Sequence, residues 1–163
     1  MNDILEKSVV DANVMSEDDC SIRRIVVAVD LSTDSEKTAE YAAAFARSFG
    51  ASLTLVHAFA PERLRKFTTE GVHERYEHNK RATEHELTEL ADSIRKTYPD
   101  CNTEFRVGDL AEEVNLVAKD LGADLIITAC HHPGFLSCLF GLDEAPRILH
   151  RAQCAVLVYH DER

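Results

Sequence analysis

The sequence lacks the features that typify membrane, secreted and nucleic-acid-binding proteins. No apolar run reaches the ~18 to 20 residues needed to span a bilayer. The N-terminus, MNDILEKSVV, is acidic and mixed in character, unlike a signal peptide. Basic residues are outnumbered by acidic ones, 18 to 29, and the formal net charge of −11 disfavours nucleic acid and anionic membranes as electrostatic partners. These absences predict a cytoplasmic protein.

Cysteine is present, but not in the patterns that cross-link small folds or bind zinc. The five cysteines are odd in number and form no CxxC pair. Reduced thiols fit this pattern better than a disulfide framework does. At 163 residues the chain is long enough to form one domain with a substantial core.

Apolar runs and amphipathic stretches alternate along the chain. They predict strands at 24–29, 53–58, 103–107, 125–128 and 155–159, and helices at 35–49, 72–98, 110–121 and 143–151. This alternation is typical of an α/β fold with a doubly wound, five-stranded parallel sheet and helices on both faces. Residues 1–21 lack clear periodicity and are expected to form a flexible acidic tail, which leaves 22–163 as the folded domain.

Each of the three longer helices shows an apolar face. The face predicted to be buried in the first helix comprises Tyr41, Ala42, Phe45, Ala46 and Phe49. The face predicted for the helix at 110–121 comprises Val114, Val117, Ala118 and Leu121. The helix at 72–98 is clearly amphipathic only in its last turns, so its first half is expected to pack loosely or to face a partner.

Unusual polar chemistry follows the fourth predicted strand, where the sequence reads Ala129-Cys130-His131-His132. Ligands of parallel sheets bind outside the carboxyl ends of the strands. A zinc site would need about four N or S ligands, but adjacent residues on extended chain point to opposite faces. A thiol switch is a second possibility, because an imidazolium lowers the pKa of a neighbouring thiol. The simplest interpretation is that one histidine fills space and hydrogen-bonds a loop carbonyl.

Four segments together resemble the universal stress protein family. They are Ile25-Val26-Val27-Ala28-Val29-Asp30-Leu31-Ser32, Leu53–His57, Ala123–Ile127 and Cys154–Val158. The resemblance covers about 22–159 and implies strand order 3-2-1-4-5, with a crevice where the first and fourth strands end. In this family the position of Asp30 lies beside adenine and ribose, and Ala58 matches a further nucleotide position. The alternative role for Asp30 is to hold the turn that follows it.

Nucleotide-binding family members carry the motif G-x2-G-x9-G-[S/T] after the fourth strand, where glycines let backbone amides approach phosphates. In this chain the four positions are Ala129, His132, Leu142 and Asp143, and none matches. Asp143 would place a negative charge where a phosphate should lie. The sequence is similar to the universal stress protein A branch, which lacks the motif, and this implies no tight ATP binding and no cofactor.

A nucleotide-binding function is the alternative. AMP or ATP could occupy the crevice of a family member whose phosphate loop is degenerate. Arg63, Arg65 and Lys66 follow the second strand and border the crevice. They form either a solvated charged face or a clamp for phosphate.

The last predicted strand, Ala155-Val156-Leu157-Val158-Tyr159, is apolar at every position. The resemblance makes it an edge strand, and a long apolar edge favours pairing with another chain. Family members use this strand for a two-fold dimer; the alternative is that the N-terminal tail covers the edge. We therefore expect a homodimeric, non-enzymatic stress-response protein that regulates an unidentified protein partner and binds neither nucleic acid nor membrane.

Overall fold

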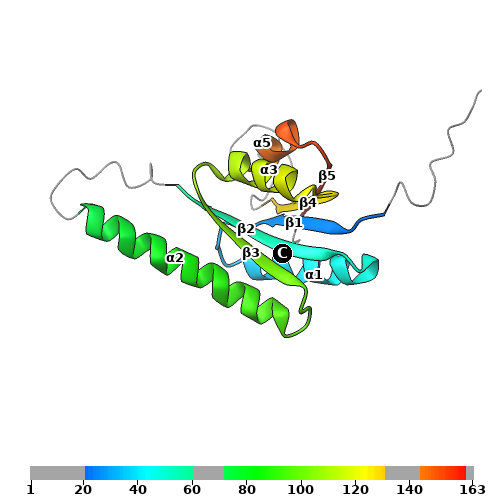
Figure 1. The fold of residues 1–163 in the computed structure, drawn as a ribbon, viewed down its shortest axis with the longest axis horizontal. Coiled ribbons are helices and arrows are strands. Elements are labelled where there is room, and N and C mark those ends of the chain that lie inside the picture. The colour runs from blue at the N-terminus through cyan, green and yellow to red at the C-terminus, as the bar shows by residue number, and fades with distance from the viewer. Residues whose placement is uncertain (1–20, 61–71, 131–143, 161–163) are drawn as a thin grey trace, which may run out of the picture.

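A five-stranded parallel sheet forms the centre of the protein. The computed structural model describes residues 21–60, 72–130 and 144–160. The strands are β1 (Arg24–Ala28), β2 (Ser52–Phe59), β3 (Cys101–Val107), β4 (Leu125–Ala129) and β5 (Ala155–Tyr159). Their order is β3-β2-β1-β4-β5, with all neighbours parallel (Figure 1). The predicted fold class and strand order are thus confirmed.

Helices cover both faces of this sheet. They are α1 (Ser35–Phe49), α2 (Val72–Arg95), α3 (Leu110–Leu121) and α5 (Glu144–Arg151). The helices α1 and α2 lie on one face, and α3 and α5 lie on the other (Figure 1). No helix in the described part of the chain combines the length and the apolarity that a membrane crossing requires.

The side chains of β1 alternate between two separate cores, as the period of a strand requires. Ile25, Val27 and Val29 point into the core beneath α1 and α2. Val26 and Ala28 point into the core beneath α3 and α5. Burial on both faces explains why β1 and β4 read as continuous apolar runs in the sequence.

The centre of the sheet joins residues that are distant in sequence. The strand β1 pairs with β4, with Ile25 opposite Leu125 and Val27 opposite Ile127. At the amino end of this pair, Oδ2 of Asp124 accepts the amides of Arg23 and Arg24 at 2.8 and 2.9 Å.

The buried face of α1 differs from the predicted one. It consists of small residues, namely Ser35, Thr38, Ala39, Ala42, Ala43 and Ala46. Tyr41 and Phe49 are 39% and 49% exposed, so their predicted burial is wrong. The small side chains let the helix lie close to the sheet, and the aromatic rings are displaced to its flank. Ala42 and Ala46 are buried as predicted.

The ends of α3 follow local sequence rules. Asp109 precedes the helix with extended backbone, and its side chain accepts the Glu112 amide. Gly122 ends the helix in the left-handed conformation, at φ 59°. Leu121 is 36% exposed and not buried as predicted, because the chain turns away from the sheet at this last residue.

The long helix α2 is buried against the sheet through its second half. Leu87, Ala91 and Ile94 are buried in the core beneath α1 and α2, as the amphipathic pattern predicts. Residues 74–83 of the first half are exposed or half-buried, and Figure 1 shows this end of the helix extending beyond the sheet. Tyr76 touches the domain through an edge-on contact with Phe59, with ring centroids 5.5 Å apart.

Candidate functional site

The carboxyl ends of β1, β2 and β4 lie together at the end of the sheet where the crevice was predicted. Val27 lies opposite Ile127, and Ala28 lies opposite Val56. The chain continues from these pairs to Asp30, Ala58 and Ala129, so the structure brings these three predicted positions to the same edge. The edge between β1 and β4 is also where the order of strands reverses, which is the usual ligand position in such sheets.

Asp30 holds the turn between β1 and α1. Its Oδ1 accepts the Ser32 amide at 3.0 Å and the Ser35 hydroxyl at 2.9 Å. The Ser35 amide in turn donates to the Ser32 carbonyl at 3.0 Å. Leu31, which lies between Asp30 and Ser32, has φ 60°, an uncommon conformation for a residue with a Cβ. The turn-holding role weighed for Asp30 is therefore present in the structure.

The end of β4 is apolar, and the backbone amide that follows it is already hydrogen-bonded. Ala129 and Ala58 are buried, with 9% and 7% of their surface exposed. The Cys130 amide donates to the Tyr159 carbonyl at 3.0 Å, which continues the pairing of β4 with β5. Cys130 is disulfide-bonded, so the expectation of reduced cysteines is wrong at this position.

Several predicted site residues lie outside the described part of the chain. They are His131, His132, Leu142, Asp143, Arg63, Arg65 and Lys66, together with residues 1–20 of the predicted tail. Within the described ranges, no group of three or more His, Cys, Asp or Glu side chains is arranged to hold a metal ion.

His57 has a structural contact at the same end of the sheet. Its Nδ1 lies 2.8 Å from the carbonyl of Val29, so the contact runs from β2 to the residue that follows β1. Its ring also lies against Phe105 of β3, with centroids 6.1 Å apart. The side chain thus links three neighbouring strands.

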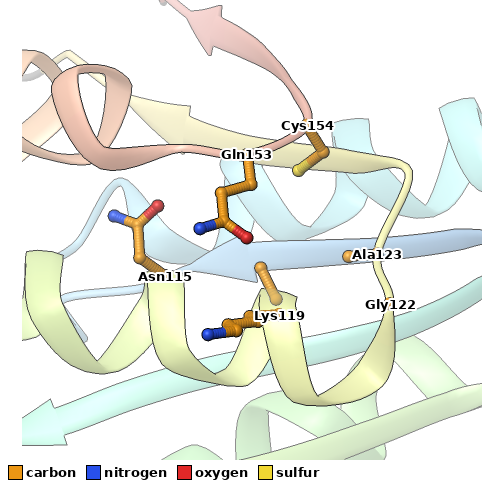
Figure 2. Close-up of a pocket in the computed structure, with 7 residues that line it drawn as sticks. Asn115, Lys119, Gly122, Ala123, Gln153 and Cys154 are labelled. Atoms are coloured by element: carbon orange, nitrogen blue, oxygen red, sulfur yellow. The ribbon is translucent and has the colours of Figure 1, made fainter.

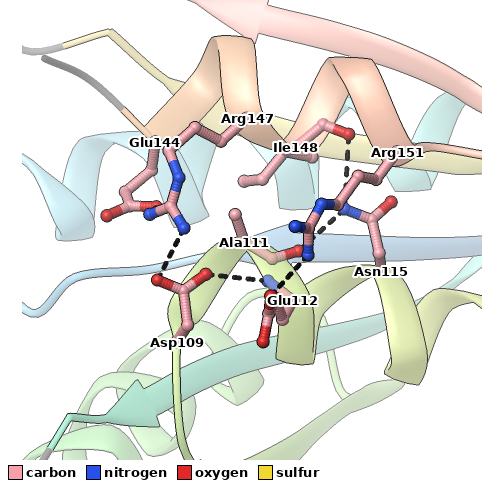
Figure 3. Close-up of polar contacts among 8 residues, drawn as sticks. All are labelled: Asp109, Ala111, Glu112, Asn115, Glu144, Arg147, Ile148 and Arg151. Carbon is pink, nitrogen blue, oxygen red and sulfur yellow. Dashed lines mark hydrogen bonds and ion pairs between the residues drawn. The ribbon is translucent and has the colours of Figure 1, made fainter. Parts of the chain in front are cut away.

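A polar network joins α3 to α5, and its residues were not predicted (Figure 3). Both helices begin on the carboxyl side of the sheet, because α3 follows β3 and α5 follows β4 along the chain. Arg147 donates to Oδ2 of Asp109 at 2.7 Å and to Oε2 of Glu144 at 2.9 Å. Oδ1 of Asp109 accepts the Glu112 amide at 3.1 Å, so one carboxylate both caps α3 and anchors α5.

Two further contacts extend the network along the helices. Arg151 donates to Oε1 of Glu112 at 2.6 Å. Nδ2 of Asn115 donates to the carbonyls of Ala111 at 2.7 Å and Ile148 at 3.3 Å (Figure 3). The sequence signal for this region is an aspartate followed three residues later by a glutamate, which is typical of a helix start.

Each carboxylate of this network is ion-paired with one of its two arginines. Partial burial raises the pKa of the Asp109 carboxyl, but the hydrogen bonds from Arg147 and the Glu112 amide outweigh it. The pKa of Asp109 therefore lies below its ordinary value of 3.8. The hydrogen bond to Asp109 raises the pKa of Arg147 in turn. The Arg147 guanidinium is thus a structural partner of carboxylates.

Comparison with known families decides the identity of the fold. The model of the universal stress protein family matches residues 21–160, which is most of the chain. This chain belongs to the universal stress protein family. No curated protein sequence matches it.

Solved structures of universal stress proteins share the fold. One, in complex with cAMP, has a TM-score of 0.68 at 18% identity, over 86% of this chain and 98% of its own. One from Lactobacillus plantarum has a TM-score of 0.68 at 17% identity, over 84% and 97%. One from Archaeoglobus fulgidus, in complex with dAMP, has a TM-score of 0.55 at 20% identity, over 85% and 98%.

The last strand of this universal stress protein is an edge strand, as the resemblance implied. Among the described elements, β5 pairs only with β4. Ala155 and Val158 are exposed, whereas Val156, Leu157 and Tyr159 are half-buried. An apolar strand at the edge of the described sheet is therefore present at the predicted residues.

A small pocket lies away from the predicted crevice. Its volume is about 170 Å³, and Asn115, Lys119, Gly122, Gln153 and Cys154 are among the residues that line it (Figure 2). It lies where α3 ends and β5 begins, at the amino ends of the strands, whereas Asp30 lies at their carboxyl ends. Ligand pockets commonly measure roughly 300 to 1,000 Å³. Burial, together with the nearby Asp124 carboxylate, raises the pKa of the Cys154 thiol, which makes it a weak nucleophile.

Proposed function

We propose that this universal stress protein is a cytoplasmic, homodimeric regulator that is not an enzyme and does not bind ATP tightly. The observation that carries the proposal is the chemistry at the end of β4. Alanine occupies the first phosphate-loop position, and the next amide, of Cys130, already donates to the Tyr159 carbonyl. A phosphate cradle needs successive backbone amides that point at the ligand, and this amide is committed to the sheet.

The charges at the starts of α3 and α5 support the same proposal. Helix N-termini attract anions through their unpaired amides and dipole. Here Asp109, Glu112 and Glu144 already supply negative charge at these starts, and each is ion-paired with Arg147 or Arg151. A triphosphate would meet carboxylates whose neighbouring arginines are already engaged.

A regulatory rather than catalytic role is supported by the polar side chains near the crevice. Asp30 accepts hydrogen bonds within its own turn, and His57 contacts the Val29 carbonyl. Groups that act in acid–base catalysis must reach a substrate proton directly or through one water. The observed contacts instead stabilise the backbone around the crevice.

Binding of an adenosine monophosphate is the second candidate function. Two structures that share this fold contain cAMP and dAMP, each with a single phosphate. A ligand with one phosphate makes fewer demands on the phosphate loop than ATP does. This chain keeps Asp30 at the family's adenine and ribose position, at the edge where β1 and β4 end.

Calorimetric titration of the full chain with ATP, AMP and cAMP tests both candidates. We expect a dissociation constant for ATP weaker than ~100 µM, which is about −5.5 kcal/mol. A constant in the low micromolar range for ATP would overturn the main proposal. Micromolar binding of AMP or cAMP without ATP binding would favour the second candidate.

A further inference from the structure

Four aromatic rings form a continuous row between α1 and β5. Tyr41, Phe45 and Phe49 follow one another along α1, with ring centroids 6.4 and 4.9 Å apart. The ring of Tyr41 stacks on that of Tyr159 in β5, with centroids 4.6 Å apart. We call these four residues the aromatic row.

The row lies on the flank of α1 that faces the edge of the sheet. On the other flank, Arg47 donates to the Thr97 carbonyl at 2.8 Å and lies 5.8 Å from the centre of the Tyr98 ring, next to the end of α2. The eight helical steps from Tyr41 to Phe49 cover ~12 Å. A five-residue strand covers a similar ~13 Å. The row is therefore about as long as β5, and it contacts that strand at Tyr159.

Two rings of the aromatic row are largely exposed in the single chain. Tyr41 is 39% exposed and Phe49 49% exposed. Alternate N–H and C=O groups of an edge strand also point away from the sheet and need partners. A strand from another copy would satisfy the backbone groups and lie close to the rings as well.

We propose that a second copy of this chain covers the aromatic row, so that α1 is part of the dimer interface. This inference rests on the proposed dimer through β5. Antiparallel pairing of two β5 strands has a two-fold axis perpendicular to the sheet, so both α1 helices lie on the same face. They flank a trough whose floor is Leu157 and Tyr159 of each copy.

The rings are suited to fill this trough. The α1 helices would stand farther apart than the ~8 to 10 Å of directly packed helices, which leaves space for side chains from both copies. The two rows run in opposite directions. Phe45 is therefore expected to contact the partner's Phe45, and Phe49 to contact the partner's Tyr41. Residues of this size bury roughly 150 to 250 Å² each.

The area requirement of a stable dimer favours this arrangement. Specific interfaces commonly bury about 800 Å² on each partner, more than a single five-residue strand edge supplies. Two rows of aromatic rings add the missing apolar area at the centre of the interface. Aromatic side chains are also the type enriched in interface cores.

A tryptophan reporter tests the inference, because the natural chain contains no tryptophan. The test variant is Phe49→Trp, and the matched control is Leu116→Trp, a 51% exposed position on α3 at the opposite face. Emission and acrylamide quenching are measured across a dilution series, with light scattering on the same samples. We expect the tryptophan at position 49 to be shielded in the dimer and exposed after dilution to monomer, and the control to be exposed throughout.

The possible results distinguish failure of this inference from failure of the proposed β5 dimer. A dimer in which the tryptophan at position 49 stays exposed would overturn the inference and leave the β5 dimer standing. A protein that is monomeric at every concentration would overturn both proposals. A shielded tryptophan in that monomer would identify the chain's own N-terminal segment as the cover.

In a second experiment, Tyr41→Ser should raise the dissociation constant of the dimer at least tenfold, whereas Leu116→Ser should not. Equal constants for the two variants would also overturn the inference.

Discussion

Arg147 of α5 donates a 2.7 Å hydrogen bond to Asp109, the residue that caps α3. The two residues are distant in sequence, and their contact fixes one end of α5 against α3. The same aspartate also accepts the Glu112 amide. Its removal therefore affects a helix cap and an ion pair together, and these two effects can be separated by substitution.

Replacement of Asp109 should lower stability in two distinguishable steps. Asp109→Ala removes the cap and the ion pair, and we expect a loss of about 1 to 2 kcal/mol in the free energy of unfolding. Asp109→Asn keeps a side-chain oxygen for the cap and should lose less. Urea denaturation measures both. Asp120→Ala, an exposed aspartate near the end of the same helix, is the control and should leave stability unchanged; equal losses for the alanine and asparagine variants would contradict the cap.

The stability supplied by Asp109 should depend on pH in a defined direction. Its pKa is lowered on folding, so the ionised carboxylate stabilises the folded state above the ordinary pKa of 3.8. This contribution is lost as the pH falls from that value through the lower pKa of the folded state. The difference in unfolding free energy between wild type and Asp109→Asn should therefore be constant near neutral pH and shrink below about pH 4. A difference that persists in acid would contradict the assignment.

Restoring the phosphate-loop motif should create or improve ATP binding. The variant combines Ala129→Gly, His132→Gly, Leu142→Gly and Asp143→Ser, which supplies the glycines and the hydroxyl at the family spacing. Calorimetry with ATP is the measurement. The matched control keeps Asp143 and changes only the other three positions, and its carboxylate should hold the affinity down. Unchanged affinity in the full variant would count against this alignment of the loop.

A charge on the edge strand should break the dimer. Val158 is 44% exposed, so Val158→Lys is compatible with the folded monomer, but it places a lysine on the open edge. Light scattering at micromolar concentration should give roughly 36 kDa for wild type, which is twice the 18.2 kDa chain, and half that mass for the variant. Leu116→Lys is the control and should remain dimeric. A dimer that survives Val158→Lys would argue against pairing through β5.

The thiol of Cys101 should be inert in the folded protein. The side chain is buried, and burial raises its pKa to about 11. At pH 8 only about one thiol in a thousand would be ionised, and the thiolate is the reactive form. Ellman's reagent, followed by mass spectrometry, should modify half-buried Cys154 before Cys101, and Cys101 should react only after unfolding. Equal rates in the native state would contradict the burial.

The strands and helices could be predicted from the sequence because their patterns are simple. A run such as Leu125–Ile127 is apolar throughout because both faces of the strand are covered. The strand order came from the family resemblance, since periodicity carries no information on which strands are neighbours. The buried face of α1 was misjudged because apolar residues cover much of that helix, and hydrophobicity alone does not distinguish small residues that lie against a sheet from aromatic residues beside it.

The candidate site was only partly predictable. Asp30 and Ala129 were expected at one edge because strand ends follow from topology, and the structure places them there. The contact of Asp109 with Arg147 could not be predicted, because it depends on how α5 lies against α3 in space. A helix cap can be read from local sequence, whereas a tertiary ion pair cannot.

The hydrogen bonds from the Arg23 and Arg24 amides to Asp124 have a consequence for the order of events during synthesis. The first strand emerges from the ribosome early, but its central neighbour is completed only about a hundred residues later. Until then, one edge of the nascent β1 has no permanent neighbour. Long-range pairings of this kind slow folding and prolong the exposure of apolar segments. We therefore expect the early part of this stress protein to depend on chaperone protection until the fourth strand arrives.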